Sequence, residues 1–178
     1  MNLRSIIFKL VSITISVCWI SACSNSTYQA QGNAGYLNQG QAKDNLTRTG
    51  EISAEELITR YSKFARQYKN YQVDPLDSVK FARLSNMEIW VFFGLWCHDS
   101  QREVPRLLKT IEKNGISFDK LRLIAVNTKK EIPQAFQSRF SIEKTPTIFV
   151  VNKGEIVATM EERPKVSIAK DLLEQVFR

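Results

Sequence analysis

The sequence is poor in the residues that bind metals. Its 178 residues include one histidine, His98, and three cysteines. These are too few, and too irregularly spaced, to form a tetrahedral zinc site. The chain also has no glycine-rich phosphate-binding loop and no serine-hydrolase motif. We therefore expect neither a metal nor a cofactor.

The sequence also lacks a block of basic residues. It has 25 Lys and Arg against 18 Asp and Glu, a net charge of +7, but the basic residues are spread along the chain. Because nucleic-acid-binding arms carry basic blocks, we interpret the excess as solvated surface charge and expect no nucleic-acid partner. The composition, 43% hydrophobic and 24% charged, suits one globular domain with a tail.

No apolar run is long enough to span a membrane comfortably. The apolar stretch over residues 11–20 is diluted by serine and threonine and follows two basic residues. This pattern is typical of an export signal, and we predict that residues 1–22 are a signal peptide. A signal cut near Ala22 with an incidental Cys23 is one alternative, and a retained transmembrane anchor is another.

The end of this segment, Ile20-Ser21-Ala22-Cys23, resembles the lipobox of bacterial lipoproteins. The resemblance implies that Cys23 is lipidated and becomes the first residue. The protein would then be anchored to a membrane of the bacterial cell envelope, with its domain outside the cytoplasmic membrane. Residues 23–50 are polar and poor in apolar side chains, so we predict a flexible tether. The domain is then expected over residues 51–178.

Hydrophobic periodicity predicts the elements of the domain. A capping box at residues 53–56 begins an amphipathic helix, and residues 79–84 are either helix or strand. The predicted order is strand, helix, strand, helix, strand, strand, helix, preceded by this extra helix. After the central strand from Ile89, a helix runs from residue 99 to a stop at Asn114-Gly115; strands follow at 121–126, 147–152 and 155–159, and helices at 132–140 and 166–177.

The stretch from Ile89 to Ser100 is the centre of the sequence. An apolar, β-branched and aromatic run gives way near Cys97 to a helical pattern with apolar residues at intervals of three and one. The first turn of a helix has unpaired N–H groups and a partial positive charge, which stabilise a thiolate. The local pattern therefore predicts a reactive thiol at Cys97.

Two motifs then point to a family. Trp96-Cys97-His98-Asp99-Ser100 resembles the Trp-Cys-x-x-Cys motif of the thioredoxin superfamily, with serine at the second cysteine position. Pro105 matches the proline of that family's active-site helix, and residues 144–155 resemble its cis-proline loop, strand and hairpin. The resemblance covers roughly residues 85–178. It implies an α/β, thioredoxin-like three-layer sandwich with a mixed central sheet of about four strands flanked by helices, and a cis bond before Pro146.

The resemblance makes Cys97 the nucleophile of a monothiol site. Ser100 cannot resolve a mixed disulfide as a second cysteine would, but its hydroxyl can donate a hydrogen bond to the Cys97 thiolate. Many thioredoxins have a buried aspartate six residues before the first cysteine, and this chain has Val91 there. With Cys18 lost in the signal and Cys23 lipidated, Cys97 is expected to be the only free thiol.

The neighbours of Cys97 have expected roles as well. His98 is either an imidazolium that raises the reactivity of the thiol or an exposed spacer, and the sequence leaves both open. The indole of Trp96 is expected to shield the sulfur and shape the surface. Thr145 and Pro146 would face the thiol, with the Thr145 backbone pairing with an extended substrate. Asp99 is interpreted as structural.

These residues predict monothiol thiol–disulfide exchange on exported proteins, of the isomerase, reductase or deglutathionylation type. The expected partners are protein thiols or disulfides and an external thiol reductant. Two alternatives remain open: a redox-inactive module that binds extended peptides, and a single-cysteine enzyme that reduces peroxides through a sulfenic acid.

Overall fold

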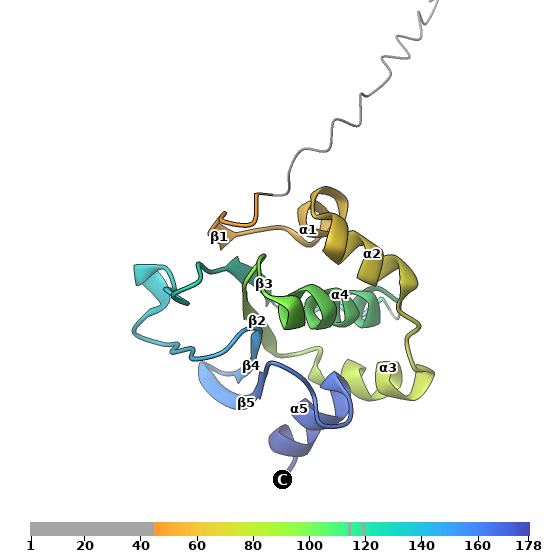
Figure 1. The fold of residues 1–178 in the computed structure, drawn as a ribbon. Helices are drawn as coiled ribbons and strands as arrows, with labels where there is room; N and C mark the ends of the chain where they lie inside the picture. The colour runs from red at the N-terminus through yellow and green to blue at the C-terminus, as the bar shows by residue number, and fades with distance from the viewer. Residues whose placement is uncertain (1–44, 114, 119) are drawn as a thin grey trace, which may run out of the picture. The chain divides into compact units, whose positions relative to one another are not determined.

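A computed structural model describes residues 45–113, 115–118 and 120–178 (Figure 1). The predicted signal peptide, Cys23 and most of the predicted tether lie outside these residues. Among the described residues before the predicted domain start at residue 51, Leu46 packs against the core and Arg48 pairs with Glu56. No helix in the described ranges has the length and apolar character needed to cross a membrane.

Five strands of the described residues form one mixed sheet. They are β1 (Gly50–Glu51), β2 (Glu88–Phe93), β3 (Lys120–Ala125), β4 (Thr147–Asn152) and β5 (Glu155–Glu161), in the spatial order β1-β3-β2-β4-β5. Only β2 and β3 are parallel. The sequence predicted about four strands, and the extra one is β1, whose two residues are too few to show a periodicity. The expected mixed α/β architecture is confirmed.

In the described part of the chain, five α-helices accompany the sheet: α1 (Ala54–Arg60), α2 (Ser62–Asn70), α3 (Pro75–Phe81), α4 (His98–Lys113) and α5 (Ile168–Val176). The ambiguous residues 79–84 are helical, since α3 continues into a 3₁₀ turn, η1 (Ala82–Leu84). The single N-terminal helix expected from residue 53 is instead two helices. They are separated by Tyr61, which has extended backbone angles and a buried ring packed edge-on against Phe64.

Side chains alternate along the strands between two cores. Ile89, Val91 and Phe93 of β2 belong to the core that also holds the buried side chains of all five helices. Trp90 and Phe92 belong to a second core on the opposite face. In Figure 1 the helices accordingly lie on one side of the sheet, while the β3–β4 connection lies on the other.

The prediction of a helix over residues 132–140, which cover the second face of the sheet, is wrong. The structure has there only a 3₁₀ turn, η2 (Gln134–Phe136), preceded by Pro133 in an extended conformation. The rings of Phe136 and Phe140 pack against Trp90 and Phe92. A segment this short gains little from helix formation, so aromatic packing decides its conformation. This face of the sheet is therefore covered by a loop with one turn.

Candidate active site around Cys97

Cys97 lies at the junction between β2 and α4. Its N–H donates to the Gly94 carbonyl at 3.0 Å, which closes a tight turn after the strand, and its carbonyl accepts from the Gln101 N–H at 2.9 Å. Because α4 begins at His98, Cys97 is the N-cap residue of a 16-residue helix. Its side chain is partly exposed. The sulfur therefore sits at the positive end of the helix and is open to a partner.

The far end of α4 is also well defined. The N–H of Gly115 donates to the Glu112 carbonyl and the N–H of Ile116 to the Ile111 carbonyl, the two bonds of a Schellman motif. Gly115 has a φ of 57°, which a glycine adopts without steric cost. The helix stop expected there is confirmed at Gly115, while Asn114 lies outside the described residues.

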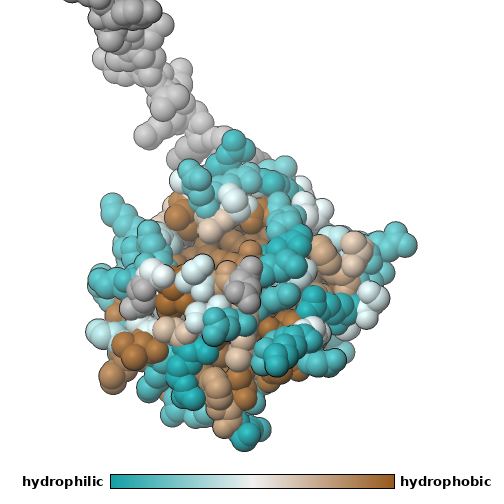
Figure 2. Space-filling model, turned by 180° about the vertical axis from the view of Figure 1, so that it is seen from behind, coloured by the Kyte–Doolittle hydropathy of each residue, from teal (hydrophilic) through white to brown (hydrophobic). Residues whose placement is uncertain are grey.

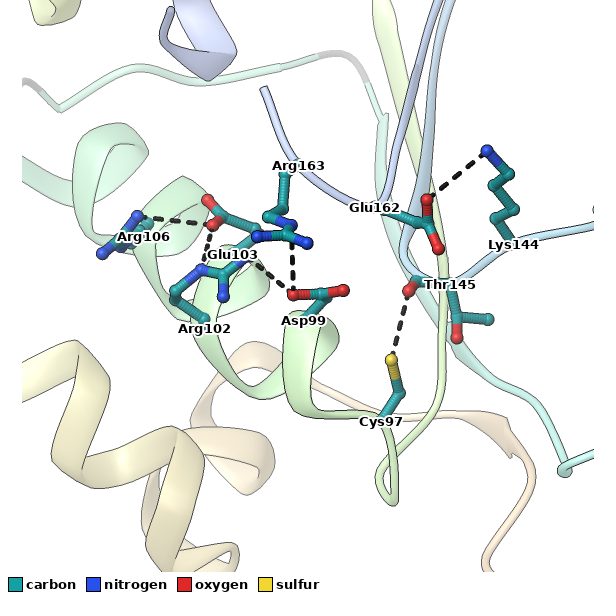
Figure 3. Close-up of polar contacts among 9 residues, drawn as sticks. All are labelled: Cys97, Asp99, Arg102, Glu103, Arg106, Lys144, Thr145, Glu162 and Arg163. Atoms are coloured by element: carbon teal, nitrogen blue, oxygen red, sulfur yellow. Dashed lines mark hydrogen bonds and ion pairs between the residues drawn. The ribbon is translucent and has the colours of Figure 1, made fainter. Parts of the chain in front are cut away.

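A second segment meets the thiol. The Cys97 Sγ lies 3.1 Å from the Thr145 carbonyl oxygen, to which the thiol donates (Figure 3). The Thr145-Pro146 bond is cis, as expected from the sequence. The Pro146 carbonyl accepts from the Glu162 N–H at 2.8 Å, which ties the loop to the end of β5. Residues far apart in the sequence thus converge on the sulfur.

The hydroxyl of Ser100 has a different partner from the expected one. Its side chain is fully buried, and its Oγ accepts from the Gly94 N–H at 3.1 Å. The hydroxyl therefore satisfies the backbone at the end of β2, and the structure records no bond from it to Cys97. His98, in contrast, is exposed, which agrees with the spacer alternative.

Trp96 is fixed beside the site by two contacts. Its indole N–H donates to the Val126 carbonyl at 3.2 Å. Its ring also lies directly over Gly94, so that a Cβ on residue 94 would be 2.6 Å from the indole Cε2. The indole can therefore occupy this position only because residue 94 has no side chain. Together the two residues shape the surface next to the thiol.

We expect Gly94→Ala to destabilise the protein by about 1–3 kcal/mol, because the new methyl group must displace the indole. The backbone of Gly94 is outside the left-handed region, so the cost is steric. Urea denaturation measures it. In a Trp96→Ala background the same substitution should be nearly neutral, and an equal cost in both backgrounds would contradict this explanation.

A chain of charged groups runs along α4 from the thiol. Arg102 bridges two carboxylates, with its Nη2 2.7 Å from Asp99 Oδ1 and its Nε 2.5 Å from Glu103 Oε1. Arg106 Nη1 lies 3.3 Å from Glu103, and Arg163 Nε from the loop after β5 lies 3.7 Å from Asp99 (Figure 3). Glu103 is 2% exposed and its Oε2 has no hydrogen-bond partner.

The network changes the pKa of the Arg102 guanidinium. Burial lowers the pKa of its guanidinium, but hydrogen bonds and charge interactions with Glu103 and Asp99 outweigh burial and raise it above its ordinary value. Arg102 therefore remains a cation beside Asp99. The negative charge of Asp99, close in sequence to Cys97, is thereby compensated. This fits the structural role expected for Asp99.

The opposite side of the site carries a second ion-pair group. Lys144 Nζ lies 3.4 Å from a Glu162 carboxylate oxygen and 3.8 Å from one of Glu161. These pairs are exposed and contribute little to stability. Within residues 45–178, apart from the two undescribed positions, no group of acidic, histidine and cysteine side chains is arranged to hold a metal.

The structure thus brings together Cys97, Trp96, Thr145 and Pro146, and it directs Ser100 inward and His98 outward. The charged network was not predicted from the sequence. Its spacing along α4 was visible in the sequence, since residues three apart on a helix can pair. The burial of Glu103 and the approach of Arg163 depend on the fold and had no local signal.

Comparisons with known proteins show the fold alone. The chain matches no protein-family model and no curated protein. It is similar to the crystal structure of a protein of unknown function from Pseudomonas aeruginosa, with 13% identity over 71% of this chain and 89% of that chain and a TM-score of 0.50. An HIV epitope scaffold is 13% identical over 70% of this chain and 84% of its own, with a TM-score of 0.45. The first likeness indicates that this chain shares its fold with a protein of unknown function.

Proposed function

We propose that this protein performs monothiol thiol–disulfide exchange through Cys97 on a thioredoxin-like fold. The observation that carries the proposal is the position of the sulfur. It lies at the N-terminus of α4, partly exposed, and 3.1 Å from the backbone carbonyl of Thr145. A thiol at a helix N-terminus next to a peptide-binding loop is suited to attack a disulfide held on that loop.

Several features of the sheet support the thioredoxin-like assignment. A parallel β2–β3 pair is followed by an antiparallel β4–β5 hairpin, and the cysteine directly follows the central strand β2. The Thr145-Pro146 loop leads into β4, the neighbour of β2. Because β2 and β4 are antiparallel, the Thr145-Pro146 loop before β4 and the cysteine after β2 lie at the same end of these two strands.

The proposed reaction has two exchange steps. In the first, the Cys97 thiolate attacks a substrate disulfide, so that a Cys97 mixed disulfide forms and one substrate thiolate leaves. In the second, the thiolate of an external thiol such as glutathione attacks the mixed disulfide and restores Cys97. The group that was joined to Cys97 leaves as a disulfide with the external thiol. When that group is glutathione from a glutathionylated substrate, the products are oxidised glutathione and a reduced substrate thiol; when it is part of a protein, a second external thiol must release it. Cys97 is the only free cysteine of the described residues, so no described thiol can replace the external one.

Thr145 has a part in this reaction. In the resting protein its carbonyl accepts the hydrogen bond of the Cys97 thiol. A thiolate has no proton to donate, so deprotonation ends this hydrogen bond and leaves both lone pairs of the carbonyl oxygen for a substrate N–H. Binding an extended substrate and activating the sulfur are thereby coupled at one oxygen.

The cellular context is part of the proposal. Lipidation of Cys23 would anchor the protein to a membrane of the bacterial cell envelope, with the domain facing exported proteins. Its partners would be their thiols and disulfides, together with an external thiol or a redox partner that supplies electrons. Mass spectrometry of the mature N-terminus tests the anchor, which predicts a lipidated Cys23 as the first residue.

The main competing function is peptide binding without chemistry. The edge of β5 is a poor site for it at Thr159, because the Gln175 side chain bonds both the N–H and the carbonyl of that residue. Reactivity of Cys97 separates the two functions.

Ser100→Cys tests the monothiol mechanism. Residues 97 and 100 lie within one helical turn, within reach of a disulfide. The introduced thiol should attack the mixed disulfide at Cys97 and release the substrate. The variant should therefore reduce insulin and accumulate an internal disulfide between positions 97 and 100. The gain is expected to be modest, because Val91 offers no proton acceptor.

The wild type should turn over a glutathionylated peptide repeatedly only when glutathione is supplied, and without it should stop after one exchange. If the wild type and Ser100→Cys are both inert, the proposal fails and the peptide-binding module replaces it. Rapid reaction of Cys97 with peroxide, with little disulfide exchange, would favour the peroxide-reducing alternative.

A further inference from the structure

One surface of the domain, remote from Cys97, carries exposed apolar side chains. Leu76 and Val79 of α3 are 66% and 72% exposed, and Phe177, directly after α5, is 48% exposed. Val79 and Arg83 are four residues apart in the helical run of α3 and η1, so they share a face. The Arg83 guanidinium lies 4.1 Å from the centre of the Phe177 ring. These four side chains form one surface, called here the α3 surface.

Three exposed cations lie on or next to the α3 surface in the sequence. Lys80, Arg83 and Arg178 are exposed, and within the described ranges none of the three forms an ion pair. Two carboxylates also belong to this part of the chain. Asp74 accepts from the Leu76 N–H at the start of α3, and Asp77 lines a pocket together with Arg106.

We infer that the α3 surface docks on an anionic lipid membrane. Exposed apolar side chains flanked by unpaired cations match the two layers of such a membrane, since the apolar groups enter the acyl boundary and the cations meet the headgroups. A stable protein interface instead needs a continuous, shape-complementary patch. Figure 2 shows, on the face seen from behind, hydrophobic side chains at the lower surface with hydrophilic ones between them.

Docking there would set the orientation of the thiol. The α3–η1 run leads into the start of β2, and Cys97 follows the end of this six-residue strand. About 20 Å therefore separates the two ends. A domain docked through the α3 surface would hold Cys97 on the side away from the membrane, accessible to soluble partners.

A lipid on Cys23 would not by itself fix the orientation of the domain relative to the membrane. The chain enters the sheet through β1, at the same end as Cys97, because Gly50 and Phe93 both pair with Ala125. Residues 23–44 can reach at most about 75 Å, whereas a domain of this size is about 35–40 Å across. The tether would therefore permit either orientation, and the α3 surface would select one. Docking itself depends neither on the lipid nor on the reactivity of Cys97.

Vesicle flotation tests the inference. The full chain carrying Cys23→Ser, which cannot be lipidated at that position, is mixed with phosphatidylcholine vesicles with or without phosphatidylglycerol. The bound fraction should be much larger on the anionic vesicles and should fall at high salt. Leu76→Ser combined with Val79→Ser should weaken the binding at least about tenfold. Ile156→Ser is the matched control, since Ile156 is 41% exposed on β5 and should not contribute.

All the variants retain residues 1–22, so any contribution of that segment is common to them. Because Leu76 and Val79 are exposed, the double variant should keep the circular dichroism and thermal unfolding of the parent. Binding of the double variant equal to that of the parent, or equal binding to neutral and anionic vesicles, would overturn the inference. A dimer that dissociates in the double variant, with vesicle binding unchanged, would identify the surface as a contact between copies and would also overturn it.

Discussion

Cys97→Ser should reduce thiol–disulfide exchange to the rate measured without protein. The hydroxyl of serine is not ionised near neutral pH, so the variant lacks the nucleophile that forms the mixed disulfide. The fold should survive, because the substitution is small and the side chain is only partly buried. A glutathionylated peptide, with release of the peptide thiol followed over time in the presence of glutathione, gives the rate. We expect the free energy of unfolding to change by less than about 1 kcal/mol.

Two neighbouring substitutions serve as controls for this loss. His98→Ala changes an exposed side chain next to the sulfur and should leave the rate within roughly twofold of the wild type if His98 is a spacer. Ser100→Ala removes the acceptor for the Gly94 N–H and should lower stability by about 1 kcal/mol. Exchange that survives in Cys97→Ser would show that Cys97 is not the nucleophile.

Glu103→Gln should be among the most destabilising single substitutions in the domain, at about 2–4 kcal/mol. The Glu103 carboxylate is almost completely buried and pairs with both Arg102 and Arg106. Removal of its charge leaves two guanidinium groups close together without the anion between them. The two arginines are partly exposed and can turn toward water, so the cost should fall below that of a fully buried pair.

Urea denaturation of the wild type and Glu103→Gln measures this cost as a shift of the midpoint. Glu174→Gln is the matched control, because Glu174 forms an exposed pair with Lys170 at 3.8 Å and should contribute less than about 0.5 kcal/mol. Equal shifts in the two variants would mean that the buried network adds no more than a surface pair.

The parts of the fold that the sequence predicted are those with strong local signals. The continuous apolar run of β2 reflects a strand buried on both faces, and the hairpin turn at Lys153-Gly154 occurs where both residues have positive φ. The helix from residue 98 has a regular apolar face, and its stop at Gly115 is set by one glycine. In each case the determining residues are close together in the sequence.

The parts that were missed depend on contacts between distant residues. Strand β1 has two residues and exists because Gly50 pairs with Ala125. The break at Tyr61 and the short η2 turn result from aromatic packing that overrides helical periodicity. Ser100 was identified as part of the site, but its partner, the Gly94 N–H, depends on how the turn after β2 folds back. Lipidation of Cys23 and export stay predictions.

The most direct test of the proposed function is to isolate the mixed disulfide at Cys97. The protein is mixed with a glutathionylated peptide in the absence of any other thiol, quenched with acid and digested for mass spectrometry. The fragment that contains Cys97 should gain either glutathione or the peptide through a disulfide, with one equivalent of the other thiol released, and glutathione added afterwards should remove the adduct. An unmodified Cys97 after prolonged incubation, with the protein folded, would contradict the proposal that this thiol performs the exchange.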